Sequence, residues 1–204
     1  MFQFYLLSTN IDYDSVLIRR GHNEARHNKK IIILPNTFLI DRFSQLLSNE
    51  GAAEYFASFV RFDKNDNLVA SKGELLLEFE AIILKLFRCY FIKRLPVLEV
   101  NFEETLSCYL KKKPWIKSSL RSKEFVQYKK YAQRYDARKV LHLDTEALSF
   151  FVVISCRELF FPTFTIPGLS IKPCDDNVFL VTYEDELLAQ ELKNLANDAG
   201  LYIR

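Results

Sequence analysis

The sequence predicts an α/β protein with a mainly parallel central sheet flanked by helices, in a single domain of 204 residues. Apolar segments of four or five residues alternate with helical segments of ten or more, which is typical of right-handed crossovers between parallel strands. Residues 31–34 are apolar throughout and mostly β-branched, as in a strand buried on both faces of a parallel sheet. We therefore expect an N-terminal strand and basic extension at residues 1–29 and a core at residues 30–204, with additional helices.

Capping and breaking residues bound the elements of the first half. Asn36 and Thr37 follow a strand and are expected to cap a helix. Ser71 and Glu74 have the capping-box spacing, and the helix that they begin must end before Pro96. The elements expected here are strands at residues 2–7, 30–34 and 97–100 and helices at residues 38–48, 52–62, 71–94 and 103–112.

Helical periodicity and turn residues bound the elements of the second half. Three prolines and Gly168 predict a loop at residues 161–173. The last helix begins with an acidic turn and ends before Gly200, as helices commonly do. The elements expected here are helices at residues 122–138, 145–159 and 184–197 and strands at residues 140–143, 178–181 and 201–203.

Several classes of protein are disfavoured by composition. The first residues have no positively charged region before the apolar run, so they do not predict a secretory signal. Charges interrupt the apolar residues 75–92, so this segment predicts a buried helix and not a membrane span. The 4 cysteines form no Cys-x-x-Cys pair, and we expect them to be reduced and mostly buried. Together these features predict a cytoplasmic protein that does not contact membranes.

Charge is unevenly distributed along the chain, although the formal net charge is only +2. Residues 111–139 hold 11 Lys and Arg against two acids, a local charge of +9. Residues 175–199 hold seven acids against one lysine, a local charge of −6. Such segregation predicts a directional field that either steers a polyanion or joins the two segments to each other.

Polar residues follow several predicted strands. In a parallel sheet the carboxyl ends of the strands meet at one edge, where carboxylates would hold Mg²⁺ or Mn²⁺ and activate water for phosphodiester cleavage. Acids at these positions also cap helices, which is the alternative interpretation. The candidate metal ligands are Asn36, Glu104 (or its neighbour Glu103), Asp144, Glu184 and Asp185, of which Asp144, Glu184 and Asp185 are the candidate catalytic residues.

Three segments resemble the PIN domain, a family of metal-dependent ribonucleases: KKIIILPNTFLID, VLHLDTEALSF and FLVTYEDELLAQELKNLANDAGLYI. The resemblance implies a parallel sheet with acids at its carboxyl edge, and Mg²⁺- or Mn²⁺-dependent cleavage of RNA. Where the family has its first Asp, this chain has Pro35 or Asn36. The resemblance therefore implies either a ribonuclease or a catalytically degenerate relative that binds nucleic acid.

The basic segment also predicts nucleic-acid binding independently, because cations along one helix face neutralise phosphates and aromatic rings stack on unpaired bases. Tyr128 and Tyr131 are either stacking surfaces or core residues of the same helix, and His142 is expected in the core. The alternative function is a non-enzymatic protein-binding subunit, such as an antitoxin, an immunity protein or a complex component, whose basic aromatic face binds an acidic partner or forms an oligomer. The candidate nucleic-acid-binding residues are Lys111, Lys112, Lys113, Trp115, Lys130, Arg134 and Arg138.

Overall fold

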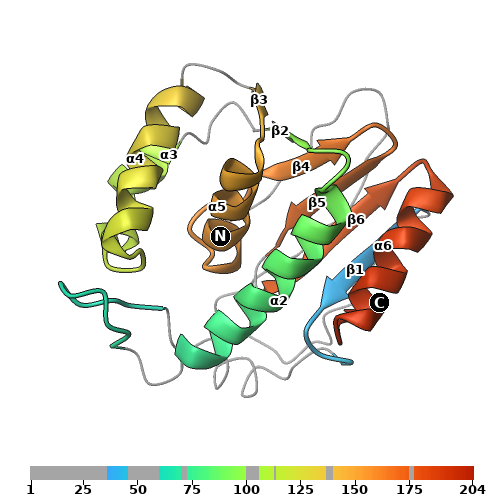
Figure 1. Ribbon diagram of the computed structural model, residues 1–204, viewed down its shortest axis with the longest axis horizontal. Helices are drawn as coiled ribbons and strands as arrows, with labels where there is room; N and C mark the ends of the chain where they lie inside the picture. The colour runs from blue at the N-terminus through green and yellow to red at the C-terminus, as the bar shows by residue number, and fades with distance from the viewer. Residues whose placement is uncertain are drawn as a thin grey trace, which may run out of the picture. The chain divides into compact units, whose positions relative to one another are not determined.

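A computed structural model describes residues 36–45, 60–69, 73–99, 106–112, 114–136, 140–174 and 177–204 (Figure 1). Contacts divide the chain into two units, Met1–Thr37 and Phe38–Arg204, and all the described residues except Asn36 and Thr37 belong to the second unit. Its strands are β1 (Thr37–Asp41), β2 (Val97–Glu99), β3 (Val140–His142), β4 (Thr163–Ile166), β5 (Leu169–Pro173), β6 (Phe179–Tyr183) and β7 (Tyr202–Ile203). Its helices are α2 (Gly73–Phe91), α3 (Leu106–Lys112), α4 (Ser122–Asp136), α5 (Thr145–Cys156), α6 (Glu186–Asp198) and the short 3₁₀ helix η1 (Pro114–Lys117).

The described strands form one sheet in the order β3-β2-β4-β5-β6-β1-β7, and its registered pairs are antiparallel. The predicted parallel, PIN-like sheet is therefore wrong. The physical reason is that β4, β5 and β6 follow one another directly as a meander, with no helix between them to carry the chain back to a parallel position.

A tight hairpin replaces the loop predicted at residues 161–173. Ile166 pairs with Leu169, which leaves Pro167 and Gly168 as a two-residue turn. Proline followed by a glycine at a φ of +83° is the pattern of a type II turn. The carbonyl of Gly168 accepts hydrogen bonds from the amides of Glu184 (2.9 Å) and Asp185 (3.1 Å), so this turn is joined to the start of α6.

Strand β1 occupies part of the range predicted as a helix at residues 38–48. Its sequence, TFLID, is rich in β-branched and aromatic residues, and Phe38 to Asp41 are buried. The strand is held to β7 by backbone bonds between Leu39 and Arg204 in both directions (2.7 and 3.0 Å) and by an Asp41–Arg204 ion pair. The predicted strands at residues 2–7 and 30–34 lie outside the described residues, as does nearly all of the helix predicted at residues 52–62.

Most other local predictions are confirmed, with ends that differ by a few residues. The helices predicted at residues 71–94, 103–112, 122–138, 145–159 and 184–197 are α2, α3, α4, α5 and α6. The strands predicted at residues 97–100, 140–143, 178–181 and 201–203 are β2, β3, β6 and β7. No helix in the described part has an apolar stretch that is long enough to cross a bilayer.

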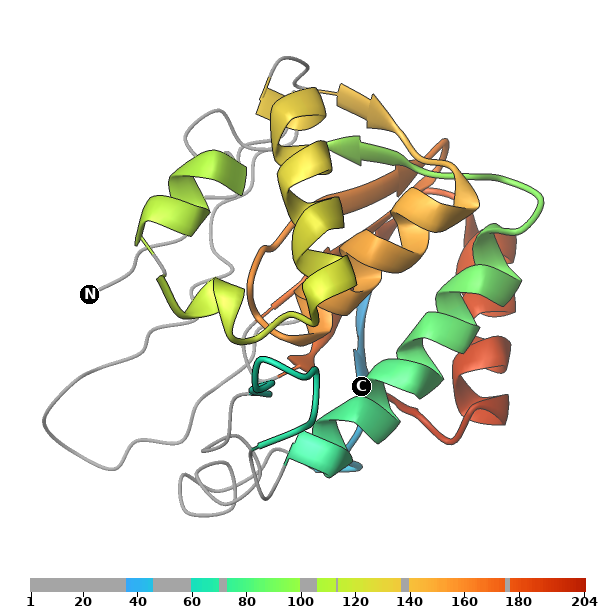
Figure 2. The ribbon, with the colours of Figure 1, turned by 60° about the vertical axis from the view of Figure 1, so that its left-hand side comes forward.

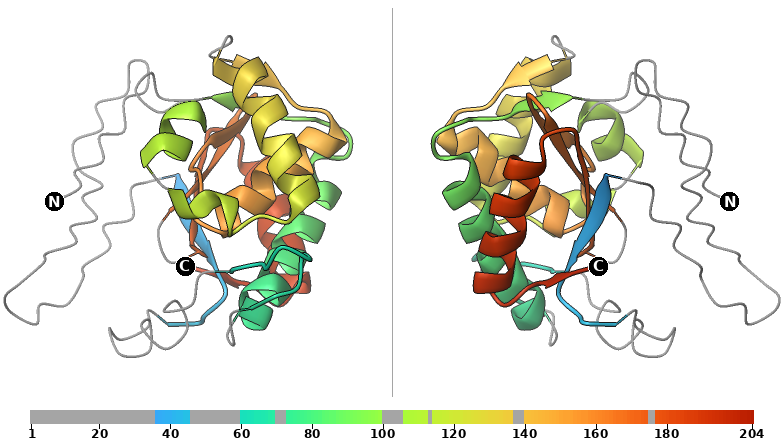
Figure 3. Two further views of the ribbon diagram at one scale, coloured as in Figure 1. Left: turned by 90° about the vertical axis from the view of Figure 1, so that its left-hand side faces the viewer. Right: turned by 90° about the vertical axis from the view of Figure 1, so that its right-hand side faces the viewer.

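The core lies between the sheet and a layer formed by α5, α2 and α6, which lie side by side on one face (Figures 1 and 3). Phe87 of α2 contacts Phe164 of β4 and Phe179 of β6, with ring centroids 5.1 and 5.4 Å apart. Helix α4 packs on α3 and lies on the far side of α5 from α2 (Figure 2). Helices α4, α5, α2 and α6 thus form a row, with α4 and α6 at its opposite ends.

Two glycines with positive φ provide a matched test of the hairpin contact. A Cβ added at Gly168 would lie 3.0 Å from the Cβ of Asp185, whereas one added at Gly200 (φ +79°) would meet nothing within 4 Å. Gly200→Ala should lower the free energy of unfolding by about 1–2 kcal/mol through backbone strain alone. Gly168→Ala should cost at least about 1 kcal/mol more, because of the added contact. Urea denaturation measures the free energy of unfolding of both variants. Equal losses would show that the hairpin moves away from Asp185 at no cost.

Candidate functional site

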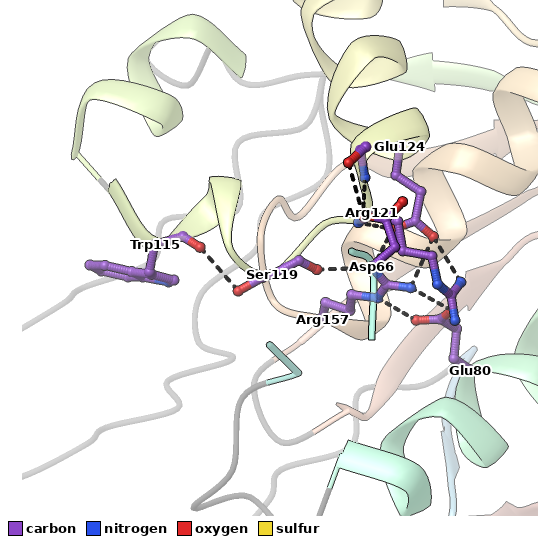
Figure 4. A network of polar contacts seen from close by, with 8 residues as sticks. Asp66, Glu80, Trp115, Ser119, Arg121, Glu124 and Arg157 are labelled. Carbon is purple, nitrogen blue, oxygen red and sulfur yellow. Dashed lines mark hydrogen bonds and ion pairs between the residues drawn. The ribbon is translucent and has the colours of Figure 1, made fainter. Parts of the chain in front are cut away.

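A buried arginine joins three helices. Arg157, directly after α5, has a side chain that is 1% exposed. Its guanidinium donates to Glu80 of α2 through Nε (2.7 Å) and Nη2 (2.9 Å), and to Glu124 of α4 through Nη1 (2.8 Å) and Nη2 (3.2 Å) (Figure 4). Nη1 also donates to the carbonyl of Ser119 at 2.9 Å. The charge of the guanidinium is therefore compensated by groups inside the protein.

The pKa values of the two carboxylates that bind Arg157 are shifted in opposite directions. Burial raises the pKa of Glu80 above its ordinary value of 4.5, and the hydrogen bonds and charge of Arg157 offset only part of this effect. Burial also acts to raise the pKa of Glu124, but hydrogen bonds from Arg157 and from the Arg121 amide, together with the charges of both arginines, outweigh it, so the pKa of Glu124 is lowered. For Arg157 burial acts to lower the pKa, and the two carboxylates overcome it and raise that pKa.

The same network holds the loop at residues 60–69 against the start of α4. Arg121 and Arg157 lie over the ring of Phe62, 4.8 and 5.3 Å from its centroid. The Phe62 amide donates to the carbonyl of Ser118 at 2.8 Å. Asp66 accepts hydrogen bonds from the amide (2.7 Å) and hydroxyl (2.9 Å) of Ser122, the first residue of α4. These contacts join the loop to the start of the helix.

Helix α4 separates its aromatic residues from its cations. Tyr128 and Tyr131 are buried, and the Tyr128 hydroxyl donates to the carbonyl of Leu106 at 2.9 Å. They are core residues and present no stacking surface for bases. The exposed side chains described on α4 include no acid; apart from Ser122 at its start, they are Lys123, Val126, Lys129, Lys130, Gln133 and Arg134.

The α4 face is defined by Lys123, Lys129, Lys130 and Arg134, whose side chains are exposed. None of these four cations forms an ion pair with another described residue. Glu124, on the same helix, faces inward to Arg157. The face therefore carries positive charge that no described side chain neutralises.

Three further candidates for nucleic-acid binding are described near this face. Lys111 and Trp115 are exposed, on α3 and η1 respectively, and Trp115 points away from the arginine network (Figure 4). Lys112 belongs to α3, but its side chain is outside what the structure describes. Lys113 and Arg138 lie wholly outside the described residues.

The predicted metal ligands that the structure describes do not lie together at one point. Asp144 caps α5 by accepting from the amide of Ala147 (2.7 Å), and Asp185 caps α6 by accepting from the amides of Leu187 and Leu188 (2.9 and 3.2 Å). Glu184, beside Asp185, is exposed. These are the capping roles that the alternative interpretation predicted.

Sheet order explains the separation. Successive antiparallel pairings make β3 and β6 run in the same direction, so Asp144 and Glu184 follow strands that end at the same edge. Three strands lie between β3 and β6, which places their ends about 19 Å apart at about 4.8 Å per strand. Strand β2 runs the opposite way, and Glu103 and Glu104, which follow it, lie outside the described residues. Asn36 is exposed in a turn at a φ of +64°. Within the described ranges no three His, Cys, Asp or Glu side chains form a metal-binding group.

Two smaller predictions need correction. His142 is exposed on the edge strand β3 and is not in the core. Of the three cysteines whose side chains are described, Cys156 alone is buried, whereas Cys89 is exposed and Cys174 is half-buried. Burial raises the pKa of the Cys156 thiol, which keeps it protonated and unreactive.

Comparison of the chain with protein-family models, curated proteins and solved structures found no match.

The arginine network was missed by the sequence reasoning, although one signal for it was present. Glu80 lies within the apolar residues 75–92, and a charge in the middle of a buried helix requires a buried partner. The partner, Arg157, follows it by 77 residues, and no local spacing connects the two.

Removing the buried cation should strongly destabilise the fold. Arg157→Met leaves Glu80 buried without compensation, and the free energy of unfolding should fall by about 3–5 kcal/mol. Arg121→Met is the matched control, because the Arg121 side chain is 45% exposed and its ion pair with Glu124 should be worth no more than about 1 kcal/mol. Chemical denaturation measures both variants, and similar losses would contradict the central role of Arg157.

The two carboxylates should respond to acid in opposite directions. The pKa of Glu124 is lowered in the folded state, so its contribution to stability is present above pH 4.5 and is lost as the pH falls through the folded-state pKa. The stability difference between wild type and Glu124→Gln should therefore shrink on acidification. The pKa of Glu80 is raised, so its contribution is present below pH 4.5 and is lost as the pH rises through the folded-state pKa. The difference for Glu80→Gln should move in favour of the wild type on acidification. Denaturation between pH 3 and pH 7 tests this, and parallel trends for the two variants would refute it.

Proposed function

We propose that this protein binds nucleic acid through phosphate contacts at the α4 face. The observation that carries the proposal is the composition of that face: its four cations are exposed, have no ion pair with a described residue, and have no exposed acid among the described side chains of α4. The exposed Glu146 of α5 contacts α4 at Gln127 (2.8 Å) and pairs with none of the four. Such a face neutralises phosphates and releases the counterions condensed on them, which drives association.

The length of the face suits a polymer. Lys123 and Arg134 are eleven residues apart on α4, a rise of about 16 Å at about 1.5 Å per residue. A nucleic-acid strand carries a phosphate about every 3.4 Å along a duplex axis, so several phosphates fit along this face. Lys111 on α3 and Lys117 on η1 are also exposed cations, and they extend the positive surface beyond α4.

The proposal is one of binding and contains no cleavage step. Asp144 and Asp185 serve as helix caps at strand ends about 19 Å apart, a distance that no single metal ion bridges with ligands at about 2.0–2.6 Å. RNA remains the polymer predicted from the sequence.

An acidic protein is the second candidate ligand, favoured by one observation. Val126 is 67% exposed in the middle of the α4 face, and Trp115 is 41% exposed nearby in the chain. Apolar and aromatic side chains among cations are typical of protein interfaces. An acidic protein would bind with a salt dependence, but it would leave oligonucleotides unbound.

The salt dependence of binding tests the proposal. For a labelled 12-nucleotide RNA, log Kd should rise linearly with log salt concentration, because each phosphate contact of a single strand contributes a slope of about 0.7. The double variant Lys130→Gln/Arg134→Gln should weaken binding and reduce this slope by about 1.4, if each side chain holds one phosphate.

The matched control is Lys85→Gln/Lys93→Gln, which removes the same charge from exposed positions at α2 and just after it, beyond α5 from the α4 face. This control should retain the slope of the wild type. Absence of oligonucleotide binding at low salt, or equal losses in the two double variants, would contradict the proposal.

A further inference from the structure

A cavity of about 470 Å³ opens where the loop at residues 60–69 meets the start of α4. Its apolar wall is formed by Phe62, Leu120 and Phe125. Ser122 and Phe125 belong to α4 itself, so the cavity adjoins the α4 face, whose first cation is Lys123. A ligand lying along that face passes the mouth of the cavity.

The cavity has the size of a small-molecule site, and its lining combines one apolar wall with polar and charged side chains. Sites for small molecules commonly enclose about 300–1,000 Å³ and are lined by aromatic and aliphatic side chains with a few polar groups. Phe125 is half-buried against the core, so its ring is held in place. Phe62 is only 8% exposed, and Arg121 and Arg157 lie over its ring. A base therefore stacks on the half-buried Phe125 ring, where it displaces the exposed Lys129 side chain that lies 4.8 Å from the ring centroid. The wall is therefore preorganised by the buried arginine network.

The charges at the cavity favour a base inside and phosphates outside. Lys64 and Lys117 line the cavity, are exposed, and form no ion pair with a described residue. Asp63 and Asp66 also line it. Hydrogen bonds from Asn67 and Asn65 lower the pKa of Asp63, which therefore stays ionised at neutral pH. The two carboxylates disfavour a phosphate in the cavity, while the two exposed lysines can contact the phosphates of a strand that passes it.

We infer that this cavity receives one unpaired base of a bound strand, so that the protein prefers single-stranded nucleic acid to duplex. The inference rests on the function proposed for the α4 face and adds the form of the ligand. Bases in a duplex are stacked and paired and cannot enter, whereas an unpaired base turns outward and stacks on an aromatic ring.

Filling the cavity tests the inference. Ser118 lines it and is exposed, and its backbone bonds to Phe62 and Trp115 do not depend on its side chain. In fluorescence anisotropy, Ser118→Leu should weaken binding of a 12-nucleotide RNA by about fivefold or more, the loss expected for one stacked base. Binding of the matching 12-base-pair duplex should not change. Asn65→Leu adds the same side chain to the loop outside the cavity and is the control that should bind like the wild type.

A change to the ligand gives a result that does not depend on any variant. A strand in which ribose spacers without bases replace the central nucleotides keeps its phosphates, and the wild type should bind it about fivefold or more weakly than the intact strand. Equal affinity for intact strand, spacer strand and duplex would overturn the inference and leave the α4 face as the binding surface. Failure of all three to bind would overturn the proposed function itself.

Discussion

The burial of Arg157 is the constraint on which the rest of this structure depends. A guanidinium is costly to remove from water, and two carboxylates and a carbonyl compensate it here. Since those groups come from α2, from α4 and from the residue at position 119, satisfying one side chain determines where three segments lie. Helix α4 can move away from α5 only by leaving charge unpaired inside the protein.

This constraint also determines which charges of α4 are exposed to solvent. Glu124 is the acid on α4 whose side chain is described, and it is turned inward to Arg157. The outer side of the helix is left with cations, and the buried tyrosines form the opposite side. Helix α6, at the other end of the helix row, holds acids that cap its start or pair with Arg94 and Lys193. No ion pair between described residues joins the basic segment to the acidic one, so the charge separation written in the sequence persists in the fold and can orient an approaching polyanion.

Local patterns in the sequence were sufficient for helices α2 to α6 and for the cations of α4, but not for residues 38–41, which form a strand where a helix was predicted. Spacing of Lys130 and Arg134 by four residues already placed them on one helix face. Strand direction was not accessible in the same way, because it depends on partners distant in the chain. The decisive signal was in residues 163–172, where apolar and polar residues alternate on both sides of Pro167 and Gly168. That alternation is typical of a hairpin with one buried face, and the prolines concealed it. Because three strands lie between β3 and β6, the acids that follow these two strands do not converge, and Asp144 and Asp185 act as helix caps.

The central claim, that the α4 face is where a polyanion binds, is tested most directly by measuring lysine acetylation with and without a saturating single-stranded oligonucleotide. Mass spectrometry compares each lysine with itself, so no variant is needed. The account predicts that Lys129 and Lys130 become protected while Lys85 and Lys93 are modified at an unchanged rate. Unchanged modification of Lys129 and Lys130 in the complex, or protection of Lys85 and Lys93 in their place, would contradict it.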